Sequence, residues 1–252
     1  MESIQLSTRY YRMYPEEEHL GYAHKELVLD KSQTVFLVVD VYGHYDPENK
    51  QGTWGNTGSY GEMWAAAIPR IRTTTDAARE AGLPVVYISN SAPRCALENS
   101  AYWEKKWDSL HVDKNQLFAE PGVDPWEYHD GDGEVLSYNE MVQPKDGDYY
   151  IRKHVHSGFF DTRLDTLLRN LDCKTLIFVG FALDMCLGTT MIDALWRNYR
   201  VVLLRDCTGA IELNGVDTEG SWTKRWILYT EYAIGSTSTA DDWIAACRQI
   251  TK

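Results

Sequence analysis

The clearest pattern in the sequence is the stretch Leu176-Ile-Phe-Val-Gly180-Phe-Ala-Leu-Asp-Met-Cys186-Leu-Gly-Thr-Thr190. Its first part is a short apolar run, which predicts a buried strand, and the run ends at Gly180 before a helix begins near Cys186. This arrangement directs the thiol of Cys186 out of the carboxyl end of a sheet and places it at a helix N-terminus. The helix dipole and the free backbone N–H groups there favour a thiolate, which is the reactive form of cysteine.

Two further groups end strands in the same way. Asp40 closes the run Thr34-Val-Phe-Leu-Val-Val-Asp40, and Lys153 closes Tyr149-Tyr-Ile-Arg-Lys153. Taken singly, each residue has an ordinary interpretation as an inert buried thiol, a turn residue or a solvated lysine. Together they supply a nucleophile, a base and a positive neighbour, because open α/β sheets bind ligands at the carboxyl ends of their strands. The combination indicates a cysteine hydrolase.

Apolar strands alternate with helix-length segments along most of the chain. We predict strands at residues 34–41, 84–90, 149–153, 175–180, 200–205 and 232–236, and helices at 62–81, 162–171, 186–198, 221–231 and 240–250. Strands separated by helices imply right-handed crossovers. We therefore expect an α/β fold of three αβα layers around a mostly parallel, six-stranded sheet, similar to a Rossmann fold.

Two regions interrupt this alternation. Residues 1–30 are expected to form an N-terminal arm that precedes a single domain at 31–252. Residues 91–147, rich in charge and in aromatic side chains, form a long insertion in that domain. Segments of this length are often lids or binding loops, and exposed aromatics are also typical of subunit interfaces. Packing of the insertion onto its own domain is an equally good interpretation.

Composition excludes several classes of function. The 252 residues carry a formal net charge of -12, whereas nucleic-acid binding requires a basic surface. No apolar run is long enough to span a membrane, and the first residues do not resemble a signal peptide. The 5 cysteines form no Cys-x-x-Cys pair, so reduced thiols in a reducing compartment fit best. We expect a cytoplasmic enzyme with a small-molecule substrate.

With these segments placed, the chain resembles the isochorismatase-like cysteine hydrolase superfamily from about residue 30 to residue 250. Val39-Asp40 matches its aspartate motif, Lys153 matches its lysine, and Gly180 through Cys186 matches its Gly-x-x-x-x-x-Cys element. The segment Lys153-His-Val-His-Ser-Gly-Phe-Phe-Asp161 is most similar to the ureidoacrylate-cleaving and other ureide-cleaving members.

Two positions depart from the family pattern. Tyr42 stands where the family often has Gln, and Leu183 stands where Thr is common. Because both border the expected pocket, the substrate of any one relative is not carried over. The sequence does not identify which amide or ureide is cleaved.

The resemblance implies that Asp40, Lys153 and Cys186 are catalytic residues that hydrolyse a C–N bond of a small linear amide or ureide through a thioester. It implies an oxyanion hole made by the backbone N–H groups of Ala182 and Cys186, with a cis peptide bond at Phe181–Ala182. Candidate substrate-binding residues, whose aromatic members are equally compatible with core packing, are Tyr42, Asn90, Trp107 (or Trp103), Phe159, Phe160 and Phe181.

The resemblance also bears on metals and assembly. The segment Ser89-Asn-Ser-Ala-Pro-Arg94 lacks the Asp-x-His cluster of nicotinamidases, and His154 and His156 have no further ligand nearby in sequence. We expect no metal ion and no cofactor. Relatives are often oligomers, and an aromatic excursion commonly becomes an interface. We expect a homo-oligomer, most simply a tetramer, in which residues 1–30 or 91–147 contact a neighbouring subunit.

Two other functions stay open at this point. One is isochorismatase-type vinyl-ether hydrolysis, in which the aspartate acts as an acid and no cysteine nucleophile is needed. The presence of Cys186 argues against it. The other is a catalytically silent binding or scaffold protein, which would leave the three filled catalytic positions without a purpose.

Overall fold

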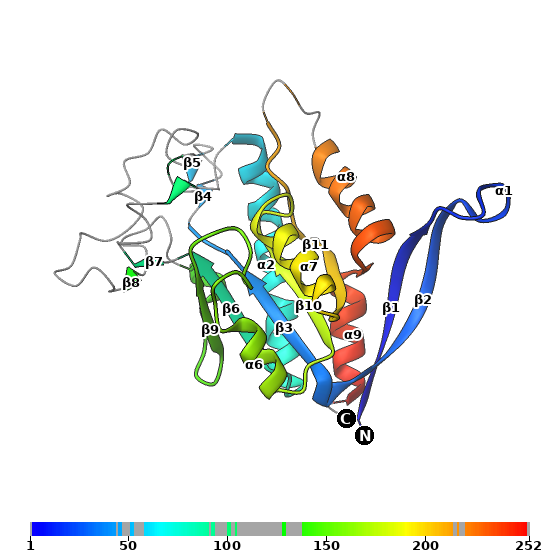
Figure 1. The fold of residues 1–252 in the computed structure, drawn as a ribbon, viewed down its shortest axis with the longest axis horizontal. Coiled ribbons are helices and arrows are strands. Elements are labelled where there is room, and N and C mark those ends of the chain that lie inside the picture. The colour runs from blue at the N-terminus through cyan, green and yellow to red at the C-terminus, as the bar shows by residue number, and fades with distance from the viewer. Residues whose placement is uncertain are drawn as a thin grey trace.

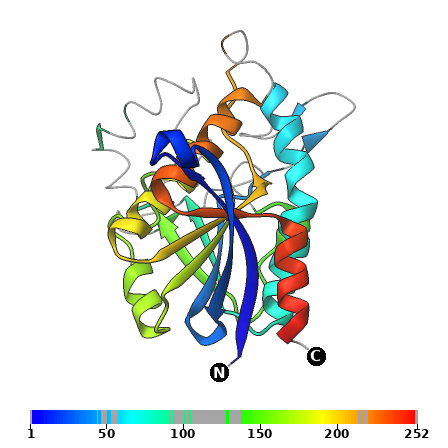
Figure 2. The same ribbon diagram turned by 90° about the vertical axis from the view of Figure 1, so that its right-hand side faces the viewer.

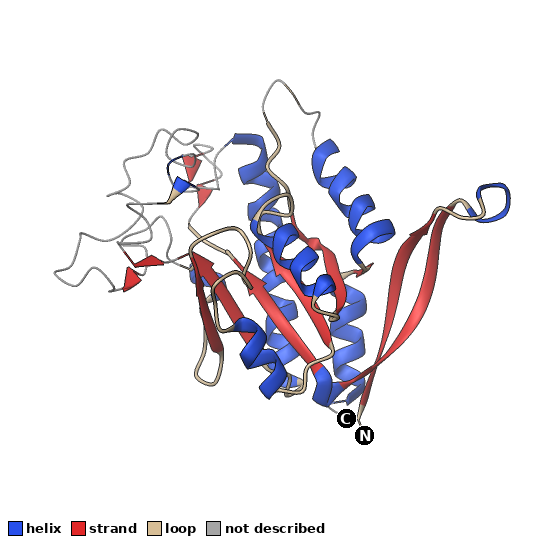
Figure 3. Cartoon of the chain, in the orientation of Figure 1, coloured by secondary structure: helices blue, strands red, loops and turns tan. Residues whose placement is uncertain are grey.

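A computed structural model of the chain describes residues 2–43, 45–46, 51–52, 58–90, 92–93, 100–101, 104, 128–129, 138–213, 216 and 220–250. The described residues fold around a central sheet with helices on both of its faces (Figure 1 and Figure 3). None of the helices in these ranges combines the length and the hydropathy that crossing a membrane requires.

The central sheet has the strand order β2-β1-β12-β11-β10-β3-β6-β9. The strands from β12 to β9 run parallel to one another. Their bounds are Thr34–Val39 (β3), Val85–Asn90 (β6), Tyr149–Lys153 (β9), Thr175–Gly180 (β10), Arg200–Thr208 (β11) and Ser236–Ser238 (β12). Central strands β3 and β10 are buried along their whole length, as continuous apolar runs predict. The α/β fold class with a mostly parallel sheet is confirmed.

The sheet contains two strands more than the sequence predicted. Residues expected to form an arm fold into a hairpin of β1 (Ser3–Arg12) and β2 (Gly21–Asp30), with the short helix α1 (Glu16–His19) at its tip (Figure 1). β1 pairs antiparallel with both β2 and β12, which makes the sheet 8-stranded. Ile4, Leu6 and Leu29 are fully buried in the main core, so the hairpin is an integral part of the sheet.

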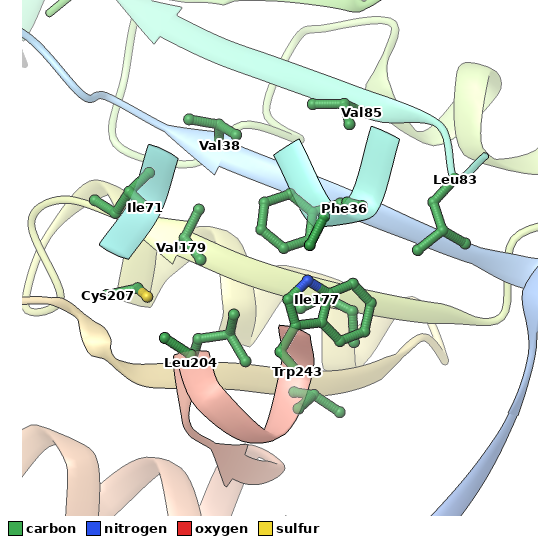
Figure 4. Packing of buried hydrophobic residues seen from close by; sticks show 14 of the residues in the cluster. Phe36, Val38, Ile71, Leu83, Val85, Ile177, Val179, Leu204, Cys207 and Trp243 are labelled. Carbon is green, nitrogen blue, oxygen red and sulfur yellow. The ribbon is translucent and has the colours of Figure 1, made fainter. Parts of the chain in front are cut away.

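Helices form the two outer layers of the αβα sandwich. α2 (Gly58–Glu80) and α9 (Ala240–Ile250) lie side by side on one face, whereas α6 (Leu164–Asn170), α7 (Cys186–Trp196) and α8 (Ser221–Tyr229) lie on the other (Figure 1 and Figure 2). Alternate residues of β3 serve the two layers, since Phe36 joins one core cluster and Val35 the other. In the first cluster the rings of Phe36 and Trp243 stack with centroids 5.6 Å apart (Figure 4).

Element boundaries differ from the prediction at a few places. α2 begins at Gly58, four residues before the predicted start at Glu62. A π-helical turn, Thr230–Ile234, continues α8, and the following strand therefore begins at Ser236 rather than at residue 232. Two single turns of 3₁₀ helix lie at Lys31–Gln33 and Glu140–Val142.

Only part of the predicted insertion is described. Four two-residue strands form two small pairs, one before the insertion and one within it: β4 (Tyr45–Asp46) with β5 (Gln51–Gly52), and β7 (Ala92–Pro93) with β8 (Tyr128–His129). Trp103 and Trp107 lie outside the described residues. Their proposed role in covering a pocket or an interface stays a prediction.

Candidate active site

The carboxyl ends of β3, β6, β9 and β10 lie at one edge of the sheet, because these strands are parallel neighbours. Asp40 follows β3, Lys153 ends β9, and Cys186 begins α7 after the loop that leaves β10. Their side chains meet at this edge, where Lys153 Nζ lies 2.8 Å from Asp40 Oδ2 and 3.3 Å from Cys186 Sγ. The structure thus brings together the three residues that the sequence singled out.

Asp40 occupies an unusual backbone conformation. Its φ is 47°, in the left-handed region that Asp and Asn adopt more readily than other non-glycine residues. Its N–H still donates to the carbonyl oxygen of Ile88 in β6 at 2.9 Å, so the chain leaves the sheet directly after this hydrogen bond. The residue is only 6% exposed. A carboxylate buried to this extent is costly unless it is paired, and Lys153 supplies the opposite charge.

Lys153 is completely buried and has a partner for each ammonium proton. Its Nζ donates to Asp40 Oδ2, to Asn90 Oδ1 at 2.5 Å and to Cys186 Sγ. Burial alone would lower the pKa of Lys153, but the charges of Asp40 and Cys186 outweigh burial and raise that pKa above its ordinary value. Lys153 is therefore a permanent cation at neutral pH.

Tyr42 and Asn90, both expected to bind substrate, are hydrogen-bonded to Asp40. The Tyr42 hydroxyl donates to Asp40 Oδ1 at 2.7 Å, and Asn90 Nδ2 donates to Asp40 Oδ2 at 3.4 Å. The backbone N–H of Asn90 in turn donates to the Tyr42 oxygen. Burial, and secondly the negative charge of Asp40, raise the pKa of Tyr42 well above its ordinary value. Tyr42 therefore stays neutral and keeps its proton.

The loop between β10 and Cys186 is fixed at several points. The N–H of Phe181 donates to Val39 O at 2.8 Å, and the N–H of Leu183 donates to Gly209 O at 2.9 Å. Gly180, with a φ of 113°, has no room for a side chain, since an added Cβ would lie 2.0 Å from the oxygen of Val39. The chain can leave β10 this closely beside β3 only with a glycine at this position.

A backbone carbonyl group of the same loop accepts hydrogen bonds at the start of α7. Phe181–Ala182 is a cis peptide bond, as expected. The oxygen of Ala182 accepts from the N–H groups of Met185 at 3.0 Å and Leu187 at 3.1 Å. Cys186 lies between these two donors, is 8% exposed, and occupies the first position of α7. These two hydrogen bonds fix the turn that leads from Ala182 into α7.

The remaining aromatic candidates lie in different environments. Phe159 is buried and stacks on Tyr199 with ring centroids 6.0 Å apart, and Phe181 is buried and stacks on Trp64 at 4.5 Å. Both belong to the core clusters, which favours the core-packing interpretation. Phe160 is 57% exposed.

Two supporting contacts were not predicted. Asp184 accepts from the N–H of Ile211 and from Trp222 Nε1, each at 3.1 Å, which ties the cysteine loop to the segment after β11 and to α8. Tyr138 forms an isolated bridge with Tyr42 and packs beside its ring. Both contacts join residues far apart in sequence, and no local pattern signals them.

Comparison with known proteins agrees with the resemblance seen in the sequence. The family profile described as "Isochorismatase domain" matches residues 34–221. The ureidoacrylate amidohydrolase RutB of Agrobacterium fabrum is 30% identical over 192 residues, covering 72% of this chain and 78% of that protein. The protein of the same name from Variovorax paradoxus is 29% identical over 219 residues, covering 86% of this chain and 82% of its own.

Solved structures show the same fold. A cysteine hydrolase from Pseudomonas syringae superposes with a TM-score of 0.68 at 21% identity, covering 88% of this chain and 95% of its own. An N-carbamoylsarcosine amidase from Thermoplasma acidophilum superposes with a TM-score of 0.56 at 22% identity, covering 83% of this chain and 97% of its own.

Proposed function

The chain belongs to the isochorismatase family, and we propose that it is a cysteine-dependent amidohydrolase that cleaves a C–N bond of a small linear amide or ureide. Asp40, Lys153 and Cys186 are its catalytic residues, and Cys186 carries a thioester during the reaction. The relatives named ureidoacrylate amidohydrolase favour a ureide as the substrate.

The position of the Lys153 ammonium supports this proposal most directly. It lies between a carboxylate at 2.8 Å and a sulfur at 3.3 Å in a site that is almost closed to water. A cation at this distance stabilises a thiolate, and the N-terminus of α7 adds to that effect. The carboxylate beside it is a base that can receive the thiol proton.

In the first half of the reaction, Asp40 takes the proton of the Cys186 thiol. The thiolate attacks the substrate carbonyl carbon, and a C–S bond forms as the carbonyl oxygen becomes negative. The backbone N–H groups of Ala182 and Cys186 stabilise this oxyanion. Asp40 then gives its proton to the departing nitrogen, the C–N bond breaks, and a thioester and a free amine or ammonia remain.

In the second half, Asp40 removes a proton from a water molecule, which attacks the thioester carbonyl. The C–S bond breaks, the proton on Asp40 returns to the sulfur, and a carboxylic acid or a carbamic acid is released. A carbamic acid formed from a ureide loses carbon dioxide without help from the enzyme. Lys153 keeps its charge throughout. It stabilises the Cys186 thiolate while Asp40 holds the proton, and the Asp40 carboxylate once that proton has been released.

A screen for ammonia release tests the activity. We expect turnover with at least one of ureidoacrylate, biuret, triuret or an N-carbamoyl amino acid, and none with the variant Cys186→Ser, because a hydroxyl is far harder to ionise than a thiol. If nicotinamide is the one substrate turned over in the screen, the cysteine mechanism stands and the proposed ureide substrate class is wrong.

The matched control is Cys247→Ala. Cys247 is also buried, but it lies in α9 on the opposite face of the sheet. This variant should retain wild-type kcat. Full activity of Cys186→Ser with any substrate of the screen would refute the assignment of the nucleophile.

A further inference from the structure

The Tyr42 hydroxyl joins two parts of the site that come from different strands. Tyr42 follows β3 by three residues, and Asn90 is the last residue of β6. The hydroxyl donates its proton to Asp40 Oδ1 at 2.7 Å and accepts a hydrogen bond from the backbone N–H of Asn90. The side chain is 5% exposed, and its ring packs beside that of Tyr138. Its single donor is therefore committed to Asp40.

The two oxygens of Asp40 are held differently. Oδ2 accepts from Lys153 Nζ at 2.8 Å and from Asn90 Nδ2 at 3.4 Å, so both of its lone pairs have donors. Within the part of the chain that is described, Oδ1 accepts from Tyr42 and has a second lone pair left. Oδ1 is consequently the oxygen on which a transferred proton can be placed without displacing Lys153.

We propose that Tyr42 is a positioning residue for the reaction proposed above, on which this inference rests: its hydroxyl holds the Asp40 carboxylate with Oδ2 on Lys153 and Oδ1 open to the proton. Tyr42 does not bind substrate through its hydroxyl. The same bond directs the positive end of the hydroxyl dipole at the Asp40 carboxylate. It therefore offsets part of the negative charge that this carboxylate places beside the Cys186 thiolate.

Several groups face Asp40 and set its environment. They are Lys153 from β9, Cys186 from the start of α7, Asn90 from β6, and the hydroxyls of Tyr42 and Tyr138. Of these, Tyr42 is a neutral donor bonded to Oδ1. Removing its hydroxyl keeps every formal charge of the site and removes two hydrogen bonds, the one to Asp40 Oδ1 and the one from the N–H of Asn90.

The test compares Tyr42→Phe with Tyr199→Phe. Tyr199 is a matched control, because it is equally buried and its hydroxyl also donates to an aspartate, Asp165 Oδ1 at 2.9 Å, away from the three catalytic groups. Two quantities are measured for both variants and the wild type. They are the steady-state constants for ammonia release from a ureide, and the pH midpoint of iodoacetamide alkylation of Cys186 without substrate.

For Tyr42→Phe we expect kcat to fall roughly 10- to 100-fold with KM within about threefold, the effect of losing one hydrogen bond to a charged group. The alkylation midpoint should rise by about half a pH unit or more, because the unscreened carboxylate makes the neighbouring thiolate less stable. Tyr199→Phe should match the wild type in both measurements. Circular dichroism establishes that each variant is folded.

The outcomes separate this inference from the proposed function. A large rise in KM with unchanged kcat and an unchanged alkylation midpoint would show that Tyr42 binds substrate, and would overturn its positioning role. If the midpoint shifts equally in Tyr199→Phe, the effect is structural and the inference fails. If wild-type Cys186 is not selectively alkylated, the proposed function fails, and the role of Tyr42 fails with it.

Discussion

Replacing Lys153 with Met removes the cation that Asp40 and Cys186 share and keeps the volume of the side chain nearly unchanged. Methionine has a similar length and fills the same buried space, so the substitution leaves no large cavity. Asp40 keeps its hydrogen bonds from Tyr42 and Asn90, whereas Cys186 Sγ loses the ammonium that lies 3.3 Å away. The variant therefore isolates the electrostatic contribution of Lys153 to the thiolate.

The size of that contribution follows from the distance. Two unit charges 3.3 Å apart interact by about 5 kcal/mol at an effective dielectric constant of about 20. One pKa unit corresponds to about 1.4 kcal/mol, so the full interaction equals between three and four units. In the variant, water that enters the site and side chains that rearrange will compensate part of the interaction energy that the thiolate loses. We expect the pH midpoint of Cys186 alkylation to rise by about two units or more.

Alkylation by iodoacetamide, followed by mass spectrometry of the peptide containing Cys186, measures this midpoint without any knowledge of the substrate. Lys174→Met is the matched control, because Lys174 is an exposed lysine paired with Asp172 on the surface. It should leave the midpoint unchanged. A Lys153→Met variant that is folded and is alkylated within half a pH unit of the wild-type midpoint would refute the electrostatic role of Lys153.

Three further outcomes are expected. Asp40→Asn should lower kcat by roughly 10²- to 10⁴-fold with little change in KM, because the residue moves protons rather than binding substrate; a kcat within tenfold of wild type would exclude Asp40 as the base. Because the pKa of Lys153 is raised in the folded protein, its stabilisation is fully present below the unfolded pKa of about 10.4 and is lost as pH rises through the folded value. The difference in unfolding free energy between wild type and Lys153→Met should thus not shrink below about pH 10 and should shrink above it, and a difference that shrinks between pH 7 and 9 would contradict the pairing. Light scattering should give a homotetramer, about four times the chain mass of 28.9 kDa, and a wild-type mass near 28.9 kDa would exclude the oligomer. The double variant Tyr14→Ser/Leu20→Ser at the exposed hairpin tip should lower the mass of the oligomer, and an unchanged mass would exclude the tip as the contact.

The catalytic positions could be predicted because each depends on a local pattern. Asp40 follows a buried apolar run, Lys153 ends the short strand Tyr149–Lys153, and Cys186 follows a second buried run across a glycine. The parallel arrangement of these strands therefore suffices to bring all three residues to one edge. Their hydrogen bonds could not be predicted in the same way. The bond from Tyr42 to Asp40 depends on a left-handed residue at position 40 and on the backbone of Asn90, which strand patterns do not encode.

The hairpin shows the same limit at the level of the fold. Ile4, Leu6 and Thr8 alternate with more exposed residues, which is the pattern of a strand, but the strand that receives β1 comes more than two hundred residues later. Sequence periodicity predicts that such a segment pairs and does not identify its partner. Phe159 and Phe181 are a similar case, because the sequence around an aromatic residue near an active site does not distinguish a side chain that packs in the core from one that contacts a ligand.

The pairing of β1 with β12 also determines when the sheet can be completed during synthesis. The hairpin leaves the ribosome well before its neighbour β12 (Ser236–Ser238), and β12 takes its place between β1 and β11 only after the helix Ala240–Ile250 has emerged. Until then one edge of the hairpin and its core-facing residues Ile4 and Leu6 have no final partner. Nascent chains stalled before residue 236 should therefore require chaperones and be sensitive to proteases within the first 30 residues, and release of the last helix should end both properties together.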